Sequence, residues 1–462
     1  MTPEREKKIL ASLYDRLFDA VTYSPEGKSA SFNKDEIYFQ MAKNAVVDPA
    51  DFANMMTPRN PNGDRRAAQV FSAFVDAIPR PGPLWVASGN TVSKAYLGWI
   101  AQANTLTQPT PAQQAIYDKA HKYLNTELKS PPDMDGNVVT SLAPSAIADT
   151  YNENMAAYNS MVRGYRTAYN SYNLDIVKDQ RDWNAVEPSL SLNVDKTWNA
   201  WVRGGKAQVE QAQAAMQSSI NNAVARAIEE AKEMAAEIHR FASLLEDKNK
   251  WFASYALPTS WAQASSQASK LTFSSAYLNE SESSSAHSYA AGLDFQYGLW
   301  HGSAKGKGRH EEGDTHMDAE NLTVEAELIA VNIIRPWFNP LLLTMKDWFV
   351  NGVKQNGISN GDRSNPQGAM PLIPTAFVVC RNVKITADFS EKDKKFINDS
   401  HEAEASGGWG PFTISAKYGY EGKSSKSQSK FDGSTLQLPG LQVIAWVSAI
   451  TPACPPLEAA AV

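Results

Sequence analysis

Cysteine is almost absent from this chain, in which Cys380 and Cys454 are the only two. Cys380 lies in a Val-rich stretch typical of a strand, which indicates a buried thiol. The sequence permits a disulfide between Cys380 and Cys454 but does not require one. This scarcity excludes a small scaffold held together by disulfides and favours synthesis in the cytoplasm.

Long apolar runs are also missing. The most apolar stretch, residues 333–350, is interrupted by charged residues and prolines such as Arg335, Pro336 and Asp347, so no pre-formed transmembrane helix of about 18 apolar residues is expected. Residues 1–21 space their apolar side chains as an amphipathic helix does, unlike a signal peptide. We therefore expect synthesis in the cytoplasm without a signal peptide, followed by release through lysis or a dedicated secretion route.

Basic charge is not in excess either, because the formal net charge is −6. A chain without a basic footprint is not expected to bind nucleic acid as its main partner. Aromatic residues are plentiful by contrast, at 10% of the chain. They fill cores, and they also enrich interfaces and membrane–water boundaries.

Recognisable catalytic motifs are missing as well. There is no GxSxG nucleophile elbow, and no serine can be paired with a particular His and Asp. We therefore expect no catalytic residue and no cofactor.

One segment, residues 301–318, is rich in side chains that can bind a metal ion. The candidate ligands are His310, Asp314, His316 and Asp318, with His301, Glu311 and Glu312 beside them. The segment is rich in glycine and lacks the helix that an HExxH site needs. We interpret it as a solvated loop between strands, and a metal-dependent enzyme stays a minor alternative.

The strongest positive signal is a ladder of large residues spaced alternately four and three apart. Its members are Tyr151, Met155, Tyr158, Val162, Tyr165, Tyr169, Tyr172 and Ile176. This spacing predicts the seam of a coiled-coil helix. Because each tyrosine hydroxyl needs a hydrogen-bond partner or water, the seam predicts a partly wet interface, within the chain or with another subunit.

Three regions follow from the change of periodicity along the chain. Residues 1–140 predict short helices, at 3–21, 64–77, 88–103 and 111–128, the third capped by Ser88 or Asn90. Residues 141–250 predict a long antiparallel helical hairpin, with arms at about 145–186 and 207–245. Residues 251–462 predict an antiparallel β domain with Ser-rich hairpins, so the fold class is α+β.

The β domain contains two units of similar layout, in which polar stretches separate alternating strands. Predicted strands include 271–278, 291–300, 322–334, 376–389, 410–420 and 437–449. The stretch 441–447 is apolar on both faces and predicts a central strand. The polar stretches 279–288 and 422–430 are small and Ser-rich, as expected either of flexible loops or of segments that are soluble before they enter a membrane. Residues that face lipid in the second case are Phe412, Ile414, Tyr418 and Tyr420.

The layout resembles that of several pore-forming toxins, although no residue role is carried over. We expect a non-enzymatic, self-associating protein that acts on membranes, with a homo-oligomer and membrane lipid as partners. Alternatives are a structural or assembly protein of a filament, shell or delivery particle, and a carbohydrate- or protein-binding β module.

Overall fold

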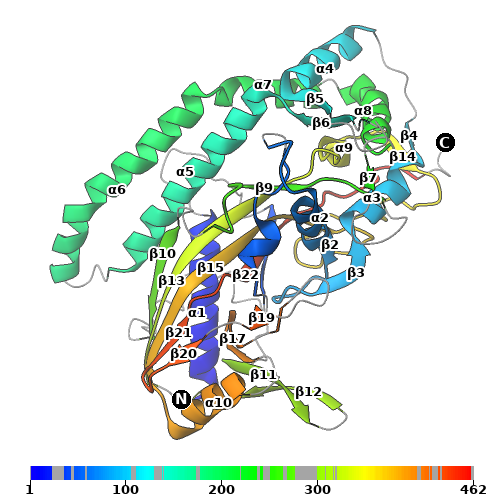
Figure 1. Cartoon of the computed structure of the whole chain (residues 1–462). Helices are drawn as coiled ribbons and strands as arrows, with labels where there is room; N and C mark the ends of the chain where they lie inside the picture. The colour runs from blue at the N-terminus through cyan, green and yellow to red at the C-terminus, as the bar shows by residue number, and fades with distance from the viewer. Residues whose placement is uncertain are drawn as a thin grey trace.

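The computed structural model describes residues 2–22, 36–42, 46–57, 60–105, 111–129, 138, 140–172, 177–218, 220–236, 240–242, 250–263, 268–275, 299–306, 309–315, 317, 320–402, 407–415, 417–418, 425–426 and 429–458. Helices dominate the first half of the chain and antiparallel strands the second (Figure 1). The predicted α+β class is therefore confirmed. No helix in these ranges is both long and apolar enough to span a bilayer.

An eight-stranded antiparallel sheet forms the centre of the molecule. Its main path runs β1 (Ile37–Met41), β22 (Gln442–Ile450), β15 (Leu372–Asp388), β13 (Glu320–Ile334) and β10 (Ser269–Ser274). The short strands β21 (Thr435–Leu438) and β20 (Lys430–Phe431) extend it beside β15, and β9 (Tyr255–Leu257) pairs with β13. Gln442–Ser448 are all buried, which confirms the predicted central strand at 441–447.

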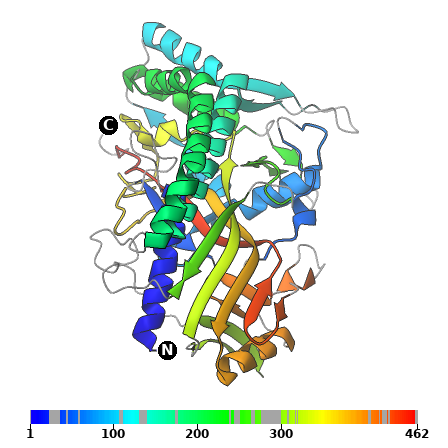
Figure 2. The same ribbon diagram turned by 90° about the vertical axis from the view of Figure 1, so that its left-hand side faces the viewer.

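Alternate residues of the long strands feed two separate cores, because successive side chains of a strand point to opposite faces. Val378 of β15 packs in one core, and its neighbour Phe377 packs in the other. The first core is covered by α1 (Pro3–Thr22), which lies along the sheet and confirms the predicted helix 3–21 (Figure 2). The second is covered by η1 (Pro49–Phe52) and α2 (Arg65–Phe74).

A β-bulge bends the two longest strands. The register between β13 and β15 shifts between the pairs Glu325↔Lys384 and Glu327↔Arg381. The extra residue on β15 is accommodated by Asn382, whose φ of 53° lies in the left-handed region. Glu327 fixes the bulge by binding Arg381 Nε at 2.7 Å and Asn382 Nδ2 at 3.2 Å. Figure 1 shows that both strands are strongly curved.

A third core is mainly helical and lies at the end of the sheet where β15 begins, since it includes Ile373. Its helices are α3 (Val92–Ile100), α4 (Pro111–Leu124), α7 (Lys206–Ser218), α8 (Ile220–Met234) and α9 (Leu341–Thr344). The short strands of this half are β2 (Ala77–Pro79), β3 (Ala87–Thr91), β4 (Ala103–Thr105), β5 (Asn125–Lys129), β6 (Thr140–Pro144), β7 (Phe241–Ala242), β8 (Lys250–Trp251) and β14 (Trp348–Val350).

Three predicted helices of the N-terminal region are too long. The helix predicted at 64–77 ends at Phe74, because Ala77 begins β2. The helix predicted at 88–103 begins after Thr91, whose hydroxyl caps it by accepting from Lys94 N, because residues 87–91 pair as β3. Ser88 and Asn90 are therefore not its cap. The helix predicted at 111–128 ends at Leu124, because residues 125–129 pair with β6.

The long hairpin exists, but its arms differ from the prediction. They are α5 (Ala146–Asn170) and α6 (Val177–Arg203), with the turn between them rather than after residue 186. Pro188 lies inside α6 at an exposed position. Packing of the α6 tryptophans on the tyrosine ladder offsets the ~3 kcal/mol that an interior proline costs. The predicted second arm, 207–245, is instead α7 and α8 in the third core.

Candidate functional site

Two long segments leave the central sheet at the same end. Ser274 at the end of β10 pairs with Thr323, Glu320 at the start of β13 pairs with Asp388, and Thr386 pairs with Thr435. Both insertion 1 (residues 276–319) and insertion 2 (residues 389–434) therefore start and finish at the same end of the strands. We call this end of the sheet the insertion end. The two segments are of nearly equal length.

The described parts of the two insertions fold together. Insertion 1 contributes β11 (Trp300–Gly306) and β12 (Arg309–Thr315), and insertion 2 contributes β16 (Gly407–Trp409) and β17 (Phe412–Ser415). These four strands form one sheet in the order β12-β11-β16-β17. Insertion 2 also contains α10 (Glu391–Glu402), β18 (Lys417–Tyr418) and β19 (Ser425–Lys426), and its last residues include β20, which pairs with β21 of the central sheet. The insertions thus satisfy part of their backbone hydrogen bonding with each other.

A glutamine side chain attaches insertion 2 to the central sheet. Thr413 N donates to Gln442 Oε1 at 2.7 Å, and Gln442 Nε2 donates to Thr413 O at 2.9 Å. Both residues are buried. The amide imitates a backbone partner, so β17 is bound to β22 through a side chain rather than through a continuous ladder.

A buried carboxylate joins the two insertions. Asp393 accepts from Trp300 Nε1 at 2.7 Å and from the Ser390 hydroxyl at 2.7 Å. Ser390 in return accepts from Asp393 N at 3.2 Å, which makes a capping box at the start of α10. One side chain therefore both begins the helix of insertion 2 and binds the first strand of insertion 1.

The predicted metal segment is a hairpin rather than a solvated loop. In its register His301 lies opposite Asp314, and Lys305 opposite His310. His301 is buried, and its Nε2 lies 2.8 Å from Gly410 O. The side chains of Glu311, Glu312, His310 and Asp314 lie outside the described part of the chain, as do residues His316 and Asp318. Within the described part, no three acidic, His or Cys residues are grouped as metal ligands.

The candidate membrane-facing residues of β17 are buried in this conformation. Phe412 and Ile414 have no exposed surface, and they pack in the core that α1 covers. Tyr418 lies in β18, but its side chain is outside the described residues, as is all of Tyr420. A membrane role for these residues therefore requires them to leave that core.

The tyrosine ladder packs within the chain, against the tryptophans of α6. Tyr151 and Tyr158 lie on Trp201, with ring centroids 5.4 and 5.5 Å apart. Tyr165 and Tyr169 meet Trp183 edge-on, at 5.5 and 5.3 Å. Tyr172 also contacts Trp183, from beyond the end of α5.

Two of the ladder hydroxyls bind carboxylates, as a partly polar seam requires. Tyr165 donates to Glu187 Oε1 at 3.1 Å, and Tyr151 donates to Glu210 Oε1 at 3.4 Å. Burial, together with the Glu210 charge, raises the pKa of Tyr151 to about 12. Both bonds hold α5 to neighbouring helices of the same chain.

Shortening a ladder tyrosine should weaken this hairpin. We expect Tyr165→Ala, which removes the Trp183 contact and the Glu187 hydrogen bond, to lower the free energy of unfolding by about 2 kcal/mol. Tyr165→Phe keeps the ring contact and should cost only about 1 kcal/mol. Urea unfolding followed by circular dichroism measures both. An unchanged midpoint in Tyr165→Ala and in Tyr169→Ala would contradict the packing role.

The opposite face of α5 covers the edge strand β10. The Ser269 hydroxyl donates to Ser160 O at 3.4 Å, and a Cβ placed on Gly164 would lie 3.8 Å from the Ser269 oxygen. Arg16 of α1 fastens the end of α5, since its Nη1 donates to Asn170 O at 3.0 Å and lies 3.5 Å from Thr272 O. The helix thereby shields a strand whose outer hydrogen-bonding groups would otherwise be open to another chain.

This cover is polar and incompletely hydrogen-bonded. Arg163 and Thr167 lie three and seven residues after Ser160, so they share the face that contacts β10. Asn159, Arg163 and Thr167 are all buried. In the described part of the chain, Asn159 Oδ1 and Thr167 Oγ1 have no hydrogen-bond partner, and no carboxylate pairs with Arg163. Each unsatisfied buried group costs about 1–3 kcal/mol, which makes the α5–β10 contact weak for its size.

A buried ionisable cluster joins α4 to α8. His121 Nε2 lies 3.3 Å from Glu230 Oε2, and Arg226 Nε lies 2.9 Å from Glu230 Oε1. Asp118 and Tyr117 complete the cluster on the α4 side. Burial raises the pKa of Glu230, and burial together with the Arg226 charge lowers the pKa of His121 below its ordinary 6.5. Burial therefore shifts both groups toward their neutral forms.

This cluster predicts a loss of stability in mild acid. The unfolded chain protonates His121 near pH 6.5 whereas the folded chain resists, so the contribution of His121 is present above pH 6.5 and is lost below it. We expect His121→Gln to reduce the fall in melting temperature between pH 7.5 and 5.5. The raised pKa of Glu230 favours the folded state as the pH falls, which is the opposite effect. Both proteins keep Glu230, so this effect is common to them. Equal falls in the two proteins would show that His121 does not titrate in this way.

Comparison with known proteins adds no assignment: no family model, curated protein or solved structure matches this chain significantly.

Proposed function

We propose that this protein self-associates on membranes and forms a pore, with the two insertions as the segments that enter the bilayer. One observation carries the proposal: both insertions start and finish at the same end of the central sheet, in continuity with strands β10, β13, β15 and β21. If these strands lengthened into the insertions, the new strands would project side by side from the insertion end of the existing sheet.

The insertions have the length and composition for such a change. A membrane-crossing strand needs about 9–11 residues, and each insertion is long enough for two of them with a polar tip. The tips, 279–288 and 422–430, are Ser-rich. Leu293, Phe295 and Tyr297 alternate with polar or small residues, as strands with one lipid-facing side do.

The contacts that hold insertion 2 are suited to release. Phe412 and Ile414 are buried against the core of α1, while the Gln442 side chain supplies the bond between β17 and β22. A hydrogen bond of this kind contributes only about 0.5–1.5 kcal/mol net, because water replaces it on opening. Lipid would in turn receive the apolar side chains that leave the core.

Self-association has its own structural support at β10. The strand lies at the edge of the sheet, and α5 covers it through the polar face of Arg163 and Thr167. If α5 moves away, the outer hydrogen-bonding groups of β10 can pair with an edge strand of a second copy. The insertions of neighbouring copies would then lie side by side.

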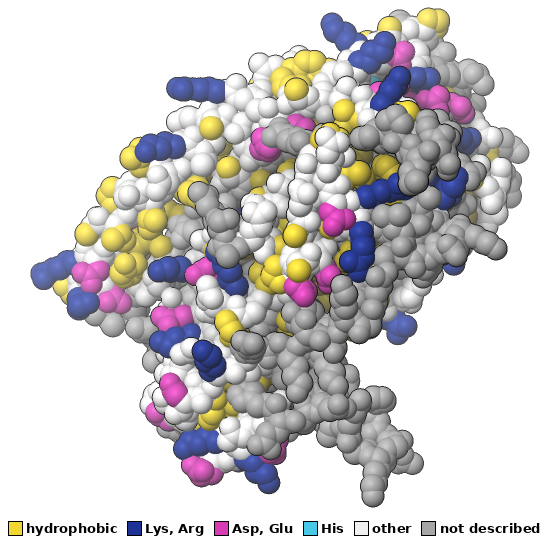
Figure 3. All heavy atoms as spheres, viewed as in Figure 1, with side chains coloured by type: hydrophobic (Ala, Val, Ile, Leu, Met, Phe, Trp, Pro, Cys, Tyr) yellow, Lys and Arg dark blue, Asp and Glu magenta, His cyan; other side chains and the backbone are white. Residues whose placement is uncertain are grey.

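The outer surface of the hairpin is a further place for contact between copies. Among the described residues, four of the eight large hydrophobic side chains that are exposed lie on α6: Val177, Val186, Leu192 and Val202. Figure 3 shows hydrophobic side chains gathered over this part of the molecule. Exposed apolar groups of this kind often mark interaction surfaces.

Dye release from lipid vesicles, combined with sizing of the protein with and without lipid, tests the proposal. We expect leakage together with an oligomer that forms on lipid. No leakage at any pH or lipid composition would reject the membrane role. An ordered polymer without lipid would favour the alternative of a structural or assembly protein, and electron microscopy would identify it.

A further inference from the structure

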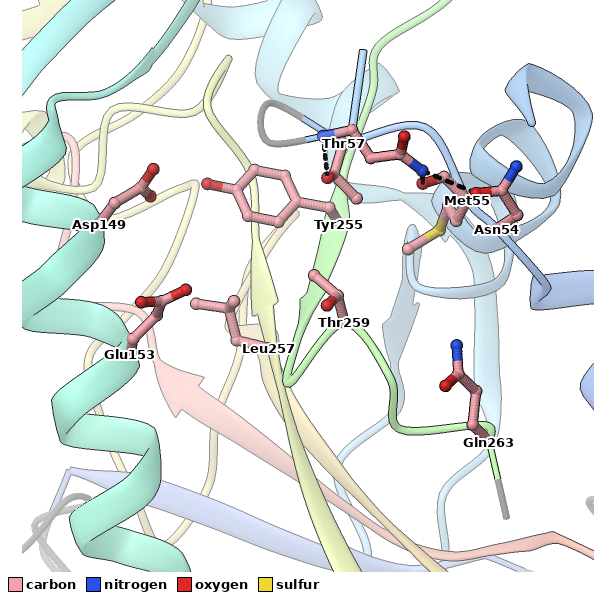
Figure 4. A pocket seen from close by; sticks show the side chains of 10 residues that line it. Asn54, Met55, Thr57, Asp149, Glu153, Tyr255, Leu257, Thr259 and Gln263 are labelled. Atoms are coloured by element: carbon pink, nitrogen blue, oxygen red, sulfur yellow. Dashed lines mark hydrogen bonds between the residues drawn. The ribbon is translucent and has the colours of Figure 1, made fainter. Parts of the chain in front are cut away.

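A polar cleft of about 370 Å³ lies far from the insertion end. Its lining comes from the loop after η1, the first turns of α5, and β9 with the residues that follow it (Figure 4). Because β9 pairs with Asn332–Ile334, the cleft lies at the other end of β13 from insertion 1. Small-molecule sites have volumes of roughly 300–1,000 Å³, so the size suits a small ligand.

One wall of the cleft carries two carboxylates. Asp149 and Glu153 are four residues apart on α5 and therefore share a helix face. Figure 4 shows both side chains projecting toward Tyr255 and Leu257, with the Tyr255 hydroxyl pointing toward Asp149. Each carboxylate has about four acceptor positions, so it can keep its contacts within the chain and still accept from a ligand.

The opposite wall presents amides in a fixed orientation. Asn60 Nδ2 donates to Asn54 Oδ1 at 2.9 Å and to Met55 O at 3.3 Å. These bonds fix both amide planes. Asn60 Oδ1 and Asn54 Nδ2 make no protein hydrogen bond in the described part of the chain, so an acceptor and a donor remain there for a ligand.

The remaining surface combines an apolar floor with further polar groups. Tyr255 and Leu257 are only 5% and 8% exposed and form the floor, beside the exposed Thr259 and Gln263. Carboxylates, amides and hydroxyls around an apolar patch match the alternating hydroxyl and C–H surfaces of a sugar ring.

We propose that this cleft binds an uncharged or amino-bearing saccharide. Its hydroxyls donate to Asp149 and Glu153 on one side and bond to Asn54 and Asn60 on the other. Asp149 and Glu153 supply acceptors, which the hydroxyl and amino groups of such a saccharide can satisfy. The inference goes beyond pore formation, because the site is complete in the soluble protein.

The position of the site gives binding a consequence for α5. A saccharide held between α5 and the lining residues Asn54 and Asn60 binds only while α5 is docked. By linkage it therefore stabilises the docked helix. Binding itself remains measurable without any membrane.

Binding of labelled protein to a glycan array, followed by calorimetry with the best saccharide, tests the proposal. We expect neutral or amino sugars to bind, and Asp149→Asn with Glu153→Gln to weaken binding at least about tenfold, since bonds to charged groups contribute about 1.5–3 kcal/mol. Glu229→Gln with Glu233→Gln, on exposed positions of α8, is the matched control and should change nothing. Asn54→Ala tests the other wall.

Three results would overturn the proposal: no bound saccharide, binding of acidic glycans alone, or equal binding by the Asp149→Asn/Glu153→Gln protein. Circular dichroism confirms that each variant is folded. Since no lipid is used, failure here leaves the pore proposal untouched, and absence of vesicle leakage leaves the saccharide site untouched.

Discussion

We expect a disulfide between α5 and β10 to abolish the vesicle leakage that we propose for this protein. A Cβ placed on Gly164 would lie 3.8 Å from Ser269 Oγ. Apart from its two chain neighbours and the helix's own backbone, no other described atom lies within 4 Å of it. Ser269 Oγ is bonded to Ser269 Cβ, so the two Cβ atoms lie close to the separation of about 3.5–4.5 Å found in a disulfide, and Gly164→Cys with Ser269→Cys can form the bond after a small local shift. Oxidised protein should leave vesicles intact, and a reducing agent should restore leakage to the wild-type level.

The single variants are the matched controls. Gly164→Cys and Ser269→Cys alone leave α5 free to move and should release dye with or without reducing agent. The native thiols do not interfere, because Cys380 and Cys454 have no exposed surface and burial raises the pKa of both. Full leakage by the oxidised double variant, with the bond verified by mass spectrometry, would show that β10 need not be uncovered.

The elements that the sequence predicts well carry their own local signals. Helix α1 has a long apolar stripe, and β22 has an unbroken apolar run that only a central strand explains. The buried thiol of Cys380 follows from the same kind of run in β15. In each case one stretch of sequence is enough, because the burial of its residues fixes the element.

The predicted position of the hairpin is wrong because its second arm depends on packing that is distant in sequence. Pro188 indicates a helix end, and Trp198 and Trp201 look like a connector until the tyrosines of α5 are set against them. Gly164 by itself indicates only a poor helix former. The close approach to Ser269 gives it a reason, but that strand lies more than a hundred residues further along the chain.

The polar cleft could not be predicted from the sequence. Its walls come from residues 54–57 and 60, from residues 149–153 and from residues 255–263, and none of these segments carries a motif. The attachment of insertion 2 did have a signal. Gln442 is a polar residue at the start of an apolar central strand, and a buried amide must find partners, but the sequence does not show that Thr413 supplies them.

Replacing Arg163 should stabilise the soluble protein. Arg163 is buried, and burial lowers its pKa to about 10. Arg163 has no carboxylate partner among the described residues, and replacing such a buried charge by an apolar side chain of similar length typically gains about 1–4 kcal/mol. We therefore expect Arg163→Met to raise the melting temperature and to slow vesicle leakage, about tenfold for each 1.4 kcal/mol by which it stabilises the docked α5.

The matched control is Arg181→Met, which removes the same charge from an exposed position on α6. It should change neither the melting temperature nor the leakage rate. The two measurements on Arg163→Met must move together, because a helix that stays docked both stabilises the fold and keeps β10 covered. A more stable protein that leaks as fast as the wild type would separate α5 from pore formation, and a less stable one would show that Arg163 contributes to the fold.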